Sequence, residues 1–169
     1  FRLPGALPYH RETMAPSSEN FTFLAAHYTK IEQVAANAER DWSHDPIGSL
    51  IRQRLFAELL VRQVAAKFRI ATGSTDNLAD VLERLERAGL PDEPVELFHR
   101  LRTKGNGAAH RGEGNAADAL ATLGAMHQLA VWFQRTFHGA SFVAPPFKTP
   151  TDPAETLRQL KAAVEAAEQ

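Results

Sequence analysis

The sequence has 169 residues, 44% of them hydrophobic and 23% charged, with a formal net charge of −1. This length and composition are typical of one soluble domain, and the balanced charge excludes a protein whose entire surface binds nucleic acid. The absence of cysteine excludes a disulfide framework and a thiolate metal site, and fits the reducing cytosol where we expect the protein. No apolar run approaches the ~18 residues of a membrane span, so we expect no membrane partner.

Residues 1–17 contain three prolines and no helical periodicity. We interpret them as an extended leader, and because Met14 lies inside it, it stays open whether residues 1–13 are native. We expect the domain itself to span residues 18–140 and to be followed by an extended segment and linker helix over 141–169.

Two helices are predicted at the start of the domain. Ser18 is expected to cap a short helix over "SENFTFLAA". Thr29, with Glu32 three residues later, predicts a capping box at the start of the next helix, over "TKIEQVAANAER".

A longer helix is predicted from Asp45, at the cap, to about Phe68, because Pro46 suits the first helical position. The middle of this segment is apolar almost all round. Such a helix is normally central in a core.

Three further helices complete the domain. One starts at Asn77 and stops at Gly89, and the next, over "PVELFHRLRTKG", is expected to end where it meets the glycines at Gly105. Another starts at Asn115 and runs to about Phe137. Together these patterns predict an all-α bundle of about five main helices.

The C-terminal part is expected to be extended where Pro145 and Pro146 forbid a helix, and helical again from Asp152. Leu157, Leu160 and Val164 lie near heptad spacing in that last helix, which has no stop signal. We therefore expect the natural protein to continue beyond it.

Arg54 and Glu58 are four residues apart on the predicted central helix, in line with Ile47, Leu50 and Val61. An ionic pair thus interrupts an apolar stripe, and each charge needs a partner if it is buried. The pair either organises a polar site inside the bundle or is a satisfied ion pair that reaches outward.

The segment 99–114 reads "HRLRTKGNGAAHRGEG". If a helix begins near Asn106, this residue caps it and His110 lies one turn further on the same face. The positive helix end and a nearby Arg102 or Lys104 would then favour an anion, and His110 would be a candidate acid or base. The alternative is a glycine-rich turn with a capping asparagine and a hydrogen-bonded histidine.

The same segment offers a candidate nucleic-acid surface, made of Arg100, Arg102, Lys104 and Arg111. The alternative is a solvated helix face without a ligand. We find no metal-ligand spacing and no nucleotide-binding loop, so we expect no metal and no cofactor in this chain.

Four stretches, "NFTFLAAH", "IRQRLFAELLVRQVAAKF", "ELFHRLRTKGNGAAH" and "LAVWFQRTFHGASFVAPPF", carry a family resemblance. Roughly over residues 19–150, the chain resembles the N-terminal helical domain of unknown function in type I restriction R-subunit-like proteins. The resemblance implies a coiled linker, then nuclease and helicase parts, downstream. The nuclease carboxylates and ATP motifs are absent here, so those activities would lie outside this chain.

The chain also resembles, more distantly, the HEPN group of helical bundles, many of which are metal-independent RNases. Their motif is an arginine, usually followed by a polar residue, and then by a histidine after three intervening residues. His110 and Asn106 match the last two positions, but Gly105 stands where the arginine should be, and Arg102 lies three residues too early. Losing that cation would cost about 2–4 kcal/mol of transition-state stabilisation.

Three hypotheses follow. The first is a non-catalytic accessory domain that binds DNA or RNA, other restriction subunits or its own downstream domains in DNA restriction. The second is an active or vestigial RNase that uses His110, Asn106 and Arg102, with Arg54 and Glu58 as supports. The third is a module that binds only protein. The HEPN resemblance also implies that two copies pair as a homodimer.

Overall fold

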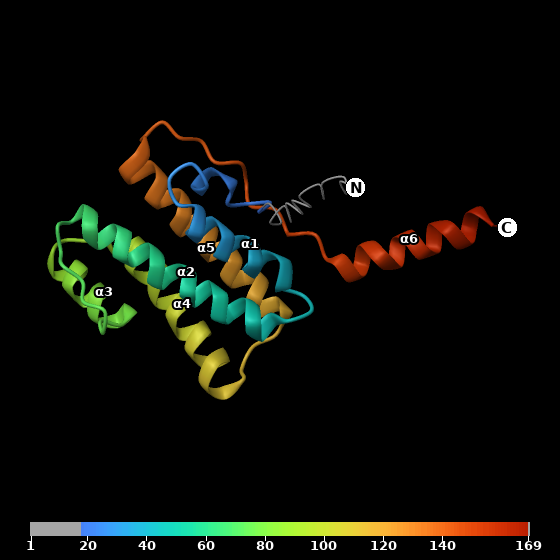
Figure 1. Ribbon diagram of the computed structural model, residues 1–169, viewed down its shortest axis with the longest axis horizontal. Helices are drawn as coiled ribbons and strands as arrows, with labels where there is room; N and C mark the ends of the chain where they lie inside the picture. Colours follow the sequence, from blue (N-terminus) through green and yellow to red (C-terminus); the bar gives the residue numbers. More distant parts are fainter. Residues whose placement is uncertain (1–17, 169) are drawn as a thin grey trace, which may run out of the picture.

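The computed structural model describes residues 18–168, so the predicted leader over residues 1–17 lies outside the described residues. Helices dominate it, and the described part contains no strand (Figure 1). The elements in chain order are η1 (Thr22–Leu24), α1 (Thr29–Asp41), α2 (Pro46–Lys67), α3 (Leu78–Arg87), α4 (Asp92–Arg111), α5 (Ala116–His138) and α6 (Pro153–Ala167). The predicted all-α bundle with five main helices, α1 to α5, is confirmed.

Helix α2 is the centre of the bundle, because α1, α3, α4 and α5 all pack against it. Most of its large apolar residues are buried, whereas Ile47 and Leu59 are partly buried, and Ile51 and Leu55 are 36% and 41% exposed. The core between the helices contains fully buried aromatic and aliphatic side chains, of which the largest are Phe21, Phe56, Phe98 and Phe133. The near-continuous apolar character of α2 therefore has the expected cause, which is contact on several sides.

Most of the predicted helix starts are confirmed by their caps. The Asp45 carboxylate accepts a hydrogen bond from the Gly48 amide at 2.9 Å, with Pro46 at the first helical position. Asn77 opens α3 in a reciprocal capping box with Asp80. Asn115 opens α5 in the same way that Asp45 opens α2, by accepting from a backbone amide of the first turn. These caps satisfy amides that have no partner within the helix.

The predicted capping box at Thr29 is wrong. Tyr28 occupies the cap position of α1 without a side-chain cap bond. The Thr29 hydroxyl donates to the Ala25 carbonyl, and Glu32 accepts from the backbone amide of Ser18. The short helix predicted over "SENFTFLAA" is only the three-residue turn η1, although the Ser18 hydroxyl does accept from backbone amides that lead into it.

The predicted end of a helix at Gly105 is also wrong, and so is a new helix start at Asn106. Helix α4 continues through both Gly105 and Gly107 to Arg111, and the chain turns only at Gly112, which has a left-handed φ of 61°. Two glycines inside a helix cost about 1 kcal/mol each relative to alanine. Both are buried, and at Gly105 the tight packing of α4 against α2 offsets that cost.

The N-terminal and C-terminal segments of the described chain are bound to each other across the bundle. Asn20 exchanges two hydrogen bonds of 2.9 Å with the backbone of Lys148. The buried Glu39 carboxylate of α1 accepts from the Ser18 hydroxyl and from the amides of Glu19 and Asn20. These bonds hold the extended segment 141–152 against the bundle, and α6 then leads away from it (Figure 1).

Candidate functional site

The polar pair on α2 reaches across to α4. The Arg54 guanidinium lies 3.1 Å from a Glu58 carboxylate oxygen through Nε, and its Nη1 donates to the Asn106 side-chain carbonyl at 3.0 Å. The Arg54 and Glu58 side chains are 25% and 37% exposed. They therefore form a half-buried network at the α2–α4 contact rather than a pair inside the core.

A cavity of about 260 Å³ opens beside this network. We call it the cation cavity, and its polar lining consists of Arg54, Glu58, Arg102 and Asn106, with the first turn of α3 on the other side. The buried Arg102 Nε has no hydrogen-bond partner within residues 18–168. Glu58 offsets one of the two guanidinium charges, so the cavity carries an excess of positive charge.

His110 lies outside the cation cavity. Asn106 and His110 do follow each other by one turn on α4, but His110 is exposed in the last turn of the helix and does not line the cavity. No hydrogen bond or ion pair joins it to another described residue. Because Asn106 is inside α4 and does not cap a helix, the anion site predicted at a helix start near Asn106 is also absent there.

Two of the four cations in the candidate nucleic-acid surface form ion pairs with acids. Lys104 Nζ lies 2.8 Å from Asp118, and Arg111 Nε lies 2.7 Å from Glu113. These cations hold the pKa values of the Asp118 and Glu113 carboxyls below their usual range. Arg100 is exposed on α4 and has no ion pair among the described residues. The four cations of the predicted surface thus divide into two neutralised ones, one solvated one and Arg102 in the cavity.

The chemistry of the cavity lining suits anion binding. Two guanidinium groups offer planar, fixed donors that match a phosphate or carboxylate, and the Asn106 amide adds a polar group. The first turn of α3 faces the same space, but its capping box with Asn77 already occupies the amides and carries the acid Asp80, so it adds no free positive helix end. Since His110 is excluded from this arrangement, no histidine of the described residues lines the cavity beside the two arginines.

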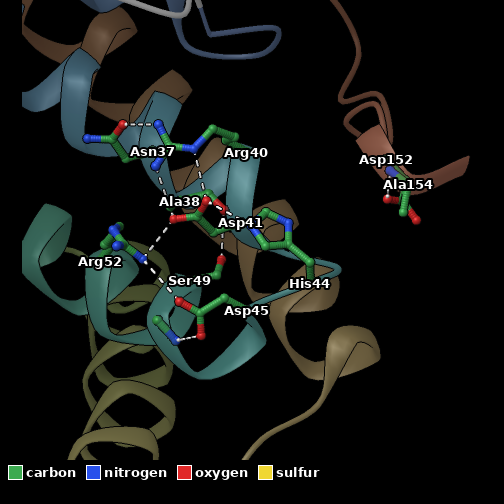
Figure 2. A network of polar contacts seen from close by, with 11 residues as sticks. Asn37, Ala38, Arg40, Asp41, His44, Asp45, Ser49, Arg52, Asp152 and Ala154 are labelled. Carbon is green, nitrogen blue, oxygen red and sulfur yellow. Dashed lines mark hydrogen bonds and ion pairs between the residues drawn. The ribbon is translucent and has the colours of Figure 1, made fainter. Parts of the chain in front are cut away.

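A second polar network, which the sequence analysis missed, fixes the corner between α1 and α2 (Figure 2). Asp41 is only 4% exposed; it accepts a hydrogen bond from Arg40 Nε at 2.9 Å and forms an ion pair with Arg52 Nη1 at 2.8 Å. His44 Nε2 lies 3.4 Å from the same carboxylate, and the Ser49 hydroxyl donates to the α1 backbone. The signal was the run of charges "ERDWSHDPIGSLIR" across a helix junction. We interpret the network as structural, because it sets the angle at which α2 enters the bundle.

Among the described residues, no group of three or more histidine, aspartate or glutamate side chains is placed to hold a metal ion. No described helix has both the length and the apolar character needed to cross a membrane.

The fold and the site define an all-α bundle with a cation-rich cavity between its central helices. The chain is similar to the type I restriction enzyme EcoKI endonuclease subunit of Escherichia coli, with 30% identity over 120 residues. The match covers 70% of this chain but only 10% of that subunit. Neither a protein-family model nor a solved structure matches the chain. The predicted likeness to a type I restriction subunit is confirmed at this level, whereas the HEPN likeness stays a prediction.

Proposed function

We propose that this chain is a non-catalytic accessory domain of a cytoplasmic, type I restriction endonuclease-like protein that acts in DNA restriction. Its role is to contact nucleic acid by holding a backbone phosphate in the cation cavity. The similarity to an endonuclease subunit supports the restriction context. In this proposal, the nuclease and motor activities belong to other parts of the full protein, which correspond to regions of the Escherichia coli subunit outside the 10% that this chain matches.

The observation that carries the phosphate role is the state of Arg102. Its Nε is buried without a hydrogen-bond partner among the described residues, and so is the Nε of the neighbouring Arg54, which is otherwise held by an ion pair with Glu58 and a hydrogen bond from Nη1 to Asn106. An unsatisfied buried guanidinium nitrogen costs free energy that an anionic ligand would recover. Phosphate contacts of this kind position a protein on nucleic acid without reading its sequence.

Two features argue against RNase chemistry in this chain. The candidate acid–base residue His110 is exposed and lies outside the cation cavity, and Gly105 occupies the position where the HEPN motif has its arginine. The direct test is to incubate the purified chain with labelled RNA and compare wild type with His110→Ala. Cleavage by the wild type that His110→Ala abolishes would contradict the non-catalytic role.

The phosphate role is tested by fluorescence anisotropy with labelled duplex DNA, single-stranded DNA and RNA at two salt concentrations. Arg102→Gln should weaken binding about equally for all sequences and lower the log–log salt slope by about one. Arg100→Gln is the matched control. It also removes one positive charge from α4, two positions before Arg102, but the Arg100 side chain does not line the cavity. Equal effects of the two variants would indicate a diffuse basic surface and contradict a defined phosphate site.

A second candidate function, docking to a partner subunit or to downstream parts of the same protein, is favoured by α6. Leu157, Leu160 and Val164 are 52%, 61% and 50% exposed, and no residue of α6 is buried. An exposed apolar stripe at this spacing is typical of a helix that packs against another helix. Light scattering on the wild type and on a Leu157→Glu, Leu160→Glu variant would show whether the stripe pairs two copies of the chain.

A further inference from the structure

A second cavity, of about 370 Å³, lies on a different part of the bundle. Its walls are the C-terminal half of α5, Glu93 in the first turn of α4, and residues 144–146 of the extended segment. We call it the Trp132 cavity, and it shares no lining residue with the cation cavity. Cavities above about 300 Å³ are large enough for small organic ligands.

The apolar surfaces of the Trp132 cavity are flat. Trp132 of α5 contributes an indole, and Pro145 and Pro146 of the extended segment contribute pyrrolidine rings. The Phe137 ring packs edge-on against Trp132, with ring centres 5.7 Å apart and planes at 89°. An indole supported in this way offers a firm surface for a planar ring system, since stacking on an aromatic side chain is tolerant of the exact base.

The Trp132 cavity also carries two opposite charges that do not neutralise each other. Glu93 and Arg135 both line it, and within the described residues neither takes part in an ion pair. Arg135 Nε donates to the Phe142 carbonyl at 2.9 Å, which orients the guanidinium and leaves its two terminal nitrogens for another acceptor. The cavity can therefore hold a ligand that has both an anionic group and N–H donors.

His127 forms a buried polar part of the wall. It is only 7% exposed, and the rings of Phe21 and Phe147 lie 5.9 and 5.6 Å from its centre. No hydrogen bond joins its nitrogens to another described residue, although the side chain lines the cavity. Burial lowers the pKa of His127, so at neutral pH the imidazole is uncharged and can both donate and accept one hydrogen bond. An imidazole that lines the cavity and has no hydrogen-bond partner among the described residues is available to a polar ligand.

We propose that the Trp132 cavity binds a nucleotide. The base lies between Trp132 and the Pro145–Pro146 wall, its N–H edge faces Glu93 and Gln128, and its phosphate contacts Arg135. The ligand is either a free nucleoside monophosphate or one unpaired nucleotide within a single strand, since both present the same ring, edge and phosphate. This site does not depend on the cation cavity or on the function proposed for it.

Tryptophan fluorescence offers a direct test, because the sequence has only two tryptophans. In Trp42→Phe, Trp132 is the sole indole, and its emission is followed while adenosine monophosphate or adenosine is added. We expect saturable quenching, with the monophosphate bound about tenfold more tightly than adenosine, as for one charge-assisted contact. Arg135→Gln should remove that difference, whereas Arg158→Gln on α6, 68% exposed and paired with Glu155, should preserve it.

The binding of a short oligodeoxyadenylate, single-stranded or in a duplex, distinguishes a free nucleoside monophosphate from an unpaired nucleotide of a single strand as the ligand. Tighter binding of the single strand than of the free monophosphate identifies an unpaired nucleotide as the ligand, and weaker binding identifies the free nucleotide. Trp42→Phe removes the hydrogen bond of 3.2 Å from Trp42 Nε1 to the Pro150 carbonyl. If this variant does not fold, calorimetric titration of the wild type and of Arg135→Gln replaces the fluorescence measurement. The proposal is overturned by no saturable signal at millimolar nucleotide, or by equal affinity for adenosine and its monophosphate in the wild type.

Discussion

The close contact between α2 and α4 at Gly105 can be tested with a single methyl group. A Cβ atom at position 105 would collide with the Arg54 Cβ and lie 3.0 Å from the Leu50 carbonyl oxygen. Both atoms are fixed to the backbone of α2, so they move only if the helix moves. Overpacking of this kind costs about 1–3 kcal/mol, and we take the upper end because neither neighbour can rotate away. Alanine regains about 1 kcal/mol of helix propensity. Gly105→Ala should therefore lower the free energy of unfolding by about 2 kcal/mol.

Gly124, inside α5, is the matched control. A Cβ there would meet only the Phe147 ring, at 4.0 Å, so Gly124→Ala should raise the stability by about 1 kcal/mol through helix propensity alone. Urea unfolding followed by circular dichroism measures both variants, with unchanged m-values expected. The two midpoints should move in opposite directions. If Gly105→Ala is as stable as the wild type, the α2–α4 contact is not as tight as the geometry indicates.

Three further predictions concern the polar contacts. Asp41→Asn should lower the free energy of unfolding by about 2 kcal/mol, since it weakens the charged contacts with two arginines. Asp45→Asn should have little effect, because asparagine caps a helix equally well. Urea unfolding midpoints measure both variants. Glu39→Ala should lower the stability by about 3 kcal/mol in the same assay, because buried donors lose their acceptor. Burial, then the neighbouring His27, lowers the pKa of His138, so stability should fall as the pH drops below about 6.5, and His138→Gln should reduce that dependence.

Much of the fold could be predicted from the sequence because helix starts are local chemistry. Asp45, Asn77 and Asn115 each bind an amide within three residues of their own position, so the pattern needs no knowledge of distant parts. Thr29 misled the prediction because its hydroxyl and Glu32 found other partners, the latter in a segment more than ten residues away. A local signal fails where a distant donor competes for the same side chain.

The site was only partly predictable for the same reason. The i, i+4 spacing of Arg54 and Glu58 indicated their pairing, which the structure shows, but the bond from Arg54 to Asn106 joins residues 52 positions apart. Glycines at 105 and 107 look like a helix end by propensity. In this chain Gly105 is a contact residue against α2, and only knowledge of what packs against it distinguishes the two cases.

The packing of α2 against α4 at Gly105 also explains why this chain has no arginine at the position of the HEPN motif arginine. The HEPN resemblance places an arginine at this position, yet any side chain there would begin against the Arg54 Cβ. The same close approach of α2 and α4 brings Arg54 within 3.0 Å of Asn106. A side chain at position 105 and this Arg54–Asn106 bond therefore compete for one space. Gly105→Arg could not restore the motif without moving α2, and it would break the network that lines the cation cavity. The close approach at Gly105 thus leaves no room for the motif arginine in this arrangement of α2 and α4.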